Sequence, residues 1–197
     1  MTNWAKTLAK TVAAILWQRL EVPGQDACRL IRHGDGWELN GHAIFEHEGA
    51  PCSLAYAAIC DEGWRTRSAS VNGFLGDRDL AFDIARTAGG EWLLNGVVQP
   101  GLGGLVDVDL GFTPATNLLA LRRFDLAVGQ DAPAPAAYLA FPELKLILLE
   151  QHYHRQSQSH YAYRGPLFGY DEVLEVAPVG FVTDYPHLWR GKLAGGG

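Results

Sequence analysis

The sequence lacks the long apolar runs, paired cysteines and surplus positive charge that mark several large classes of protein. No run reaches the ~18 consecutive apolar residues of a membrane-spanning helix. Sixteen lysines and arginines stand against 22 aspartates and glutamates, giving a net charge of −6. That balance argues against a protein that tracks nucleic-acid phosphates or docks electrostatically on anionic lipids.

Cysteine usage points to a reducing compartment. The three cysteines, Cys28, Cys52 and Cys60, form no C-x-x-C pair, and their odd number does not suit a disulfide framework. We therefore expect a cytoplasmic protein.

The N-terminal segment resembles a signal peptide only faintly, because its apolar run over residues 12–16 is short and no small-x-small cleavage site follows. Its apolar residues instead recur at helical spacing, at Trp4, Leu8, Val12 and Ile15. We expect a helical extension over residues 3–14.

The rest of the chain has the pattern of an all-β protein. From residue 15 onward, short β-rich segments alternate with turns that contain Gly, Pro, Asn or Asp, at intervals of about eight to twelve residues. The sequence shows no internal repeat and no interdomain linker. We predict a single domain over residues 1–197, with the β structure over 15–190 and a flexible tail over 191–197.

One segment, residues 113–123, has the start and stop signals of a helix. Thr113 suits the N-cap, Pro114 suits the first helical position, and Arg122 and Arg123 would oppose the helix dipole in the last turn. A helix of about ten residues is not stable alone in water. We therefore expect strands to pack around it.

Charged residues cluster in two short strings. These strings suggest either a functional site or ion pairs that stabilise the fold. Asp107 and Asp109 would lie on one side of a strand, about 7 Å apart, as in an inverting glycosidase. Arg65 and Arg67 present the complementary charges on another strand. Alternatively, these arginines and carboxylates form bidentate ion pairs that join separate parts of the fold. The sequence favours this interpretation.

Other catalytic and metal-binding patterns are absent. His152, His154 and His160 would share a strand region, but no second zinc-binding pattern accompanies them, so no metal site is expected. There is no G-x-S-x-G elbow and no complete dinucleotide-binding glycine motif, and no cofactor is expected.

Several strings together resemble a bacterial family described as putative glycolipid-binding, formerly a domain of unknown function. The resemblance covers about residues 15–190, and its most specific part runs from Asp107 to Asn117. The other strings are Trp17-Gln18-Arg19-Leu20, Cys60-Asp61, Trp64-Arg65-Thr66-Arg67-Ser68, Leu121-Arg122-Arg123 and Gln151-x-Tyr153-x-Arg155.

The resemblance implies a spiral β-roll, in which about fifteen mostly antiparallel strands wrap around a single helix, and it implies a homodimer. It also implies a glycolipid or other amphiphile as ligand, held without catalysis and without a cofactor. The polar residues nearest the ligand head group would then be Trp64, Arg65, Arg67, Asp107, Asp109, Asn117, Arg123 and Tyr153.

Two other functions stay open on the sequence. One is a carbohydrate-active hydrolase that uses Asp107 and Asp109, which requires both carboxylates to face one open cleft. The other is a structural or interaction module in which the polar strings only lock the helix into the sheet.

Overall fold

The computed structural model describes residues 9–194 and consists mainly of β-strands. The first six strands form a meander of long hairpins. They are β1 (Lys10–Arg19), β2 (Gly24–His33), β3 (Gly36–His47), β4 (Ala50–Asp61), β5 (Thr66–Leu75) and β6 (Arg78–Arg86). Alternate residues of these strands are buried, as in β4, which places one face of the sheet on the core.

Shorter elements complete the chain. They are β7 (Trp92–Leu94), β8 (Val97–Gln99), β9 (Asp107–Leu110), α1 (Asn117–Phe124), β10 (Asp131–Pro133), β11 (Ala136–Leu139), β12 (Leu146–Leu149), β13 (His152–Arg155), β14 (His160–Gly165), the 3-10 helix η1 (Pro166–Phe168), β15 (Tyr170–Val176), β16 (Val182–Tyr185) and β17 (Trp189–Leu193). No helix within residues 9–194 has the length and apolar character needed to cross a membrane.

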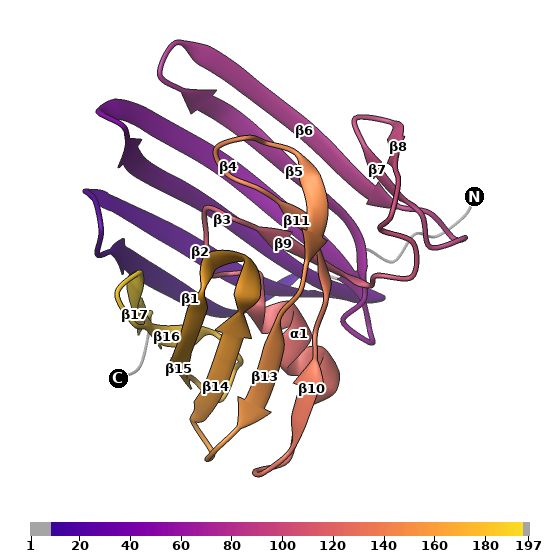
Figure 1. Ribbon diagram of the computed structural model, residues 1–197, viewed down its shortest axis with the longest axis vertical. Coiled ribbons are helices and arrows are strands. Elements are labelled where there is room, and N and C mark those ends of the chain that lie inside the picture. The colour runs from indigo at the N-terminus through magenta and orange to yellow at the C-terminus, as the bar shows by residue number, and fades with distance from the viewer. Residues whose placement is uncertain (1–8, 195–197) are drawn as a thin grey trace.

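Fourteen strands form one long antiparallel sheet, in the order β10-β13-β14-β15-β16-β17-β1-β2-β3-β4-β5-β6-β7-β8. Strand β1 pairs with β17, so the two halves of the chain join in the middle of the sheet and its edges are β10 and β8. A second sheet, β12-β11-β9, has β11 antiparallel to β12 and parallel to β9. The large sheet curves around α1, and the small sheet crosses its open side (Figure 1). This arrangement confirms the predicted fold class.

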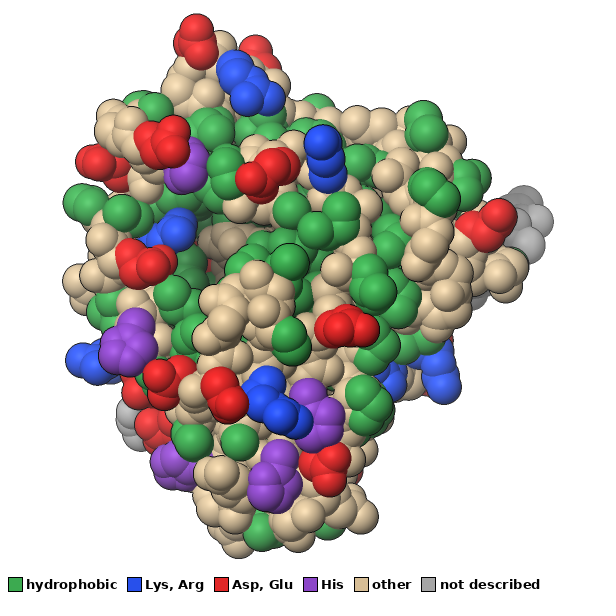
Figure 2. Space-filling view, viewed as in Figure 1, with side chains coloured by type: hydrophobic (Ala, Val, Ile, Leu, Met, Phe, Trp, Pro, Cys, Tyr) green, Lys and Arg blue, Asp and Glu red, His purple; other side chains and the backbone are tan. Residues whose placement is uncertain are grey.

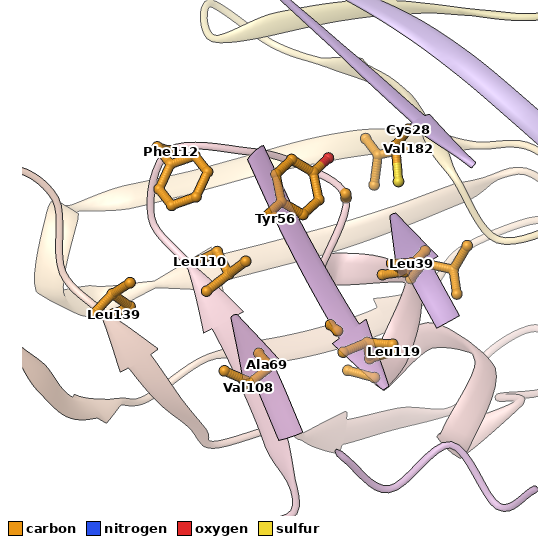
Figure 3. Packing of buried hydrophobic residues seen from close by; sticks show 14 of the residues in the cluster. Cys28, Leu39, Tyr56, Ala69, Val108, Leu110, Phe112, Leu119, Leu139 and Val182 are labelled. Atoms are coloured by element: carbon orange, nitrogen blue, oxygen red, sulfur yellow. The ribbon is translucent and has the colours of Figure 1, made fainter. Parts of the chain in front are cut away.

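The core joins the helix to both sheets. Helix α1 buries Leu118, Leu119 and Leu121 in one large hydrophobic cluster that also contains residues from both sheets. Figure 3 shows Leu119 of α1 in the same core as Leu39 of β3 and the side chains of β4, β9 and β11. The short helix is therefore held by tertiary packing, as its length requires.

The start of the helix differs from the sequence-based expectation. Helix α1 begins at Asn117 rather than near Thr113, and its N-cap residue, Thr116, makes no side-chain capping bond. The Thr113 hydroxyl instead donates to the buried Asp26 carboxyl and accepts the Ala115 N–H group. The hydroxyl thus joins the segment before the helix to β2 and does not cap the first turn of α1.

Both predicted termini also need correction. Residues 10–14 belong to β1 and pair with β2, because ladder hydrogen bonds override the helical spacing of their apolar side chains. Residues 3–8 of the expected helix lie outside the described residues. Residues 191–193 belong to β17 and pair with β1, so they are not part of a tail. Residues 195–197 lie outside the described residues.

Candidate functional site

A cleft of about 360 Å³ opens between the large sheet and the small sheet, beside the start of α1. Figure 2 shows a hollow near the middle of this face of the molecule, with hydrophobic side chains around it. The cleft is lined by Arg19, Glu21, Asp109, Leu110, Gly111, Thr113, Pro114, Asn117, Tyr138, Leu149, Tyr163, Phe168, Tyr170, Tyr185, Leu188 and Trp189. These residues come from both ends of the chain, which the β1–β17 pairing brings together, and from its middle, between residues 109 and 149.

The segment that connects β9 to α1 forms the polar floor of the cleft. The Leu110 N–H group donates to the Thr116 hydroxyl at 3.2 Å, which folds the segment back on itself. Gly111 lies against Tyr138 of β11, where a Cβ atom would come within 2.3 Å of the tyrosine hydroxyl. A glycine at this position therefore permits the tyrosine to lie over the floor.

A buried network beneath the floor holds this segment in place. The Tyr56 hydroxyl donates to both oxygens of the Asp26 carboxyl, at 3.1 and 2.9 Å, and the Thr113 hydroxyl donates to the same group. Burial raises the pKa of Asp26 to about 6, although both hydrogen bonds oppose the rise. The network ties β2 and β4 to the segment before α1.

Asp109 places a nearly buried carboxyl in the cleft floor. Its residue surface is 8% exposed. Burial raises the pKa of Asp109 to about 7, and the charge of Asp107 adds to the rise, whereas hydrogen bonds with Gln151 and Thr116 oppose it. Near neutral pH this group is therefore present in both protonation states, and it can accept or donate a hydrogen bond.

Asn117 and the tyrosines behind it form a polar layer next to Asp109. The Asn117 side-chain amide donates to the Tyr153 hydroxyl at 2.6 Å. On the next strand, the Tyr163 hydroxyl donates to the Gln151 side-chain oxygen at 2.9 Å. Tyr163 also contacts Tyr185, with ring centroids 5.8 Å apart. The inner wall thus combines aromatic rings with groups that can hydrogen-bond.

Arg19, at the end of β1, supplies the positive charge of the cleft. Its guanidinium lies over the ring of Phe45 at 4.6 Å and near the ring of Trp189 at 5.3 Å. Its Nη2 atom lies 3.7 Å from a carboxylate oxygen of Glu21, whereas its Nε and Nη1 atoms are buried and have no hydrogen-bond partner in the part of the chain that the structure describes. Burial lowers the pKa of Arg19 from its ordinary value.

Asp107 does not line the cleft, unlike its neighbour Asp109. Arg123 of α1 binds it through Nε at 3.0 Å and through Nη2 at 2.5 Å. The side chains of this pair are 2% and 16% exposed for Asp107 and Arg123, respectively. The pair therefore connects the end of the helix to β9, as the structural reading of the charged strings predicts.

Trp64, Arg65 and Arg67 also lie outside the cleft. The Trp64 ring stacks on Trp37, with centroids 4.4 Å apart, and the Arg122 guanidinium lies over it at 5.3 Å. Arg65 and Arg67 are exposed, and Arg67 forms a surface ion pair with Asp35 at 2.7 Å. Of the candidate ligand-binding residues, only Asp109, Asn117 and Tyr153 meet at the cleft or directly behind it.

The sequence analysis did not select Arg19 or the tyrosines of the cleft. Arg19 and Gln151 occur in the strings that carry the family resemblance, but nothing local distinguishes Arg19 from the other arginines. Tyr138, Tyr163, Tyr170 and Tyr185 come from separate strands, so their gathering has no signal in the linear sequence.

The histidines that suggested a metal site serve other contacts. His152 bonds the Asp131 carboxylate at 2.9 Å, across β10 and β13. His160 bonds the hydroxyl of Ser157 at 3.1 Å. Among residues 9–194, no group of three or more His, Cys, Asp or Glu side chains is arranged to hold a metal ion.

Two solved structures share this fold over nearly the whole chain. A DUF1089 family protein from Pseudomonas aeruginosa is 28% identical, with a TM-score of 0.72 over 96% of this chain and 98% of that chain. A beta-barrel-like protein of the DUF1849 family from Brucella abortus is 10% identical, with a TM-score of 0.56 over 95% of this chain and 98% of that chain. The second likeness concerns the fold alone.

No curated protein sequence matches the chain significantly. A family model described as "Putative glycolipid-binding" matches residues 14–191, which is nearly the whole extent of the two sheets. By this match, the chain belongs to the putative glycolipid-binding family.

Proposed function

We propose that this chain binds an amphiphile, with a hydroxylated head group such as a sugar held in the cleft. One observation carries the proposal: the polar floor of Asp109 and Asn117 lies between walls of tyrosine and tryptophan rings. Carboxyl and amide groups suit the hydroxyls of a sugar, and aromatic rings suit its apolar faces. The cleft volume of about 360 Å³ falls within the range of small-molecule sites.

An apolar rim beside the cleft suits the tail of such a ligand. We define this rim as Ile147, Leu167 and Phe168, which are 38%, 54% and 56% exposed. Phe168 lines the cleft and contacts Tyr138, with ring centroids 5.6 Å apart. Ile147 pairs with Tyr138 between β12 and β11, so the two side chains share one face of the small sheet. The head group would thus enter the cleft while the tail follows the rim.

Titration calorimetry with octyl β-D-glucoside, below its aggregation concentration, tests the proposal. We expect saturable binding, weakened roughly tenfold by Phe168→Ser through the loss of apolar contact with the tail. The matched control is Val97→Ser, which removes a side chain that is 64% exposed and does not line the cleft. Absence of binding, together with no lipid retained by the purified protein in native mass spectrometry, would contradict the proposal.

The hydrolase alternative finds less support in this geometry. A glycosidase of the usual kind needs two carboxyl groups on either side of the scissile bond. Asp107 is held by Arg123 outside the cleft, and only Asp109 of the pair lines it. Binding without bond cleavage is therefore the function that we propose.

We also propose a homodimer and a cytoplasmic location, as the sequence led us to expect. Exposed apolar side chains on the outer face of β3–β5, Ile44, Ile59 and Phe74, offer a surface for a second copy. The three cysteines are all free and buried, which suits a reducing compartment. Light scattering after gel filtration would test the dimer, and a monomeric mass at high concentration would rule it out.

A further inference from the structure

Arg19 is an unusual residue within the cleft. Its guanidinium packs against aromatic rings, but its N–H groups lack hydrogen-bond acceptors among the residues that the structure describes. Its side chain is only 18% exposed, and the rings of Phe45 and Trp189 lie within 5.3 Å of the guanidinium carbon. Stacking of this kind engages the face of the guanidinium. The Nε and Nη1 atoms are buried, so Nη2 is the guanidinium nitrogen that remains available to an acceptor in the cleft.

The surrounding protein supplies few acceptors for those N–H groups. The Nε and Nη1 atoms have no hydrogen-bond partner within residues 9–194, and the closest carboxylate oxygen, of Glu21, is too distant at 3.7 Å for a hydrogen bond to Nη2. Buried polar groups in native proteins are nearly always hydrogen-bonded. Arg19 is thus a costly residue for the fold, and a role in binding explains its place in the cleft.

We infer that the cleft ligand carries an anionic group and that Arg19 binds this group. The inference rests on the proposed function and specifies its ligand class: an amphiphile whose head group combines hydroxyls with a carboxylate, phosphate or sulfate. A guanidinium forms short charge-assisted hydrogen bonds with such oxyanions. The hydroxyls of the head group face Asp109 and Asn117, and the anion faces Arg19.

The other charges of the cleft allow this arrangement. Glu21 is half exposed, so water screens its charge. Burial raises the pKa of Asp109 to about 7, so near neutral pH a large fraction of the molecules carry no charge on this group. The positive charge of Arg19 is therefore not cancelled by the floor of the cleft.

Two probes that differ only in charge test the inference. Octyl β-D-glucuronide has the ring and tail of octyl β-D-glucoside, with a carboxylate in place of one hydroxymethyl group. We expect the wild-type protein to bind the glucuronide roughly tenfold more tightly at pH 7 in titration calorimetry. Equal affinity for the two probes would overturn the inference, and this comparison needs no variant.

Variants at position 19 then test whether Arg19 causes the preference for the glucuronide over the glucoside. We expect Arg19→Gln to bind both probes with equal affinity, because the glutamine is neutral. Arg19→Lys keeps the charge but not the planar set of donors, so it should retain part of the preference. The control is Arg190→Gln, which removes an exposed cation beside Trp189, outside the cleft lining. A preference that persists in Arg19→Gln would overturn the assignment.

A third probe, methyl β-D-glucuronide, separates the inference from the proposed function. If it binds as tightly as octyl glucuronide, and Arg19→Gln weakens it, the anion site stands while the amphiphile of the proposed function is rejected. If octyl glucoside binds but octyl glucuronide binds no better, the proposed function stands and the anion site is rejected. If none of the probes binds, both are rejected.

Discussion

The Asn117 side-chain amide donates a hydrogen bond to the Tyr153 hydroxyl at 2.6 Å, and this contact joins the first residue of α1 to strand β13. Both residues are buried, at 5% and 1% exposure. The contact aligns the start of the helix with the strand that lies behind the cleft. It therefore positions the cleft floor as well as holding the helix.

Loss of the Tyr153 hydroxyl should destabilise the protein. In Tyr153→Phe the buried amide of Asn117 loses its partner, at a cost of about 1–3 kcal/mol in the free energy of unfolding. The control is Tyr161→Phe, since that hydroxyl makes no hydrogen bond with any residue between 9 and 194. Urea denaturation of both variants measures the difference, and equal stabilities would show that the contact contributes nothing.

The pair between Asp107 and Arg123 should contribute far more than an exposed ion pair. Removal of the cation in Arg123→Ala leaves the carboxylate of Asp107 buried and unpaired, at a cost of about 3–5 kcal/mol. Arg67→Ala breaks the exposed pair with Asp35 and should change the stability far less, because water screens this pair.

The double variant Asp107→Asn/Arg123→Ala checks this explanation. It should recover part of the lost stability, because no unpaired charge remains in the core. Thermal or urea unfolding of the single and double variants gives the numbers. A double variant less stable than Arg123→Ala would contradict the argument.

The stability of the protein should decrease as the pH rises from about 4 to about 7. Burial raises the pKa of Asp26 to about 6 and that of Asp109 to about 7, both from 3.8. The folded chain therefore holds these protons more tightly than the unfolded chain, and their stabilising effect is lost as the pH passes the folded pKa.

Asp109→Asn should reduce this pH dependence, because the asparagine cannot ionise. We expect the variant to be more stable than the wild type at pH 8 by on the order of 2–4 kcal/mol and nearly equal to it at pH 4. Asp79→Asn, at an exposed position of β6, serves as the control. Urea unfolding across this pH range measures the slopes, and identical slopes in wild type and Asp109→Asn would refute the assignment.

The same variant separates a binding role of Asp109 from a purely structural one. If the carboxyl binds head-group hydroxyls, Asp109→Asn should fold normally and bind octyl β-D-glucoside roughly tenfold more weakly. If the residue only locks the helix into the sheet, Asp109→Ala should unfold the protein, and no change in affinity should accompany Asp109→Asn. Calorimetry and circular dichroism on both variants distinguish the two roles.

Much of the fold could be predicted because its signals are local. Turn residues at regular spacing predicted a β protein, and the apolar residues and terminal charges of 113–123 predicted a helix in that segment. The start of that helix was wrong by several residues because Thr113 binds Asp26, which is 87 positions away in the chain. Residues 10–14 of the N-terminal helix predicted over residues 3–14 form a strand instead, because β2 pairs with this segment.

The candidate site was predicted only in part, for a similar reason. Asp109 and Asn117 lie within one short string, so sequence analysis found both. Arg19 and Tyr185 meet in the cleft because β17 lies between β16 and β1 in the large sheet. No pattern in the linear sequence indicates that β17 pairs with β1 and β16.

By itself, the sequence determined the fold class, the helix within residues 113–123 and the family, since these follow from alternation, turn chemistry and specific local strings. Only the tertiary structure decided which charged side chains lie in the cleft and which form ion pairs that stabilise the fold. Asp107 and Asp109 are two residues apart on β9, yet one is bound by Arg123 and the other faces the cleft. The physical reason is that burial and partners, which set the chemistry of a charged group, depend on strands that are distant in the chain.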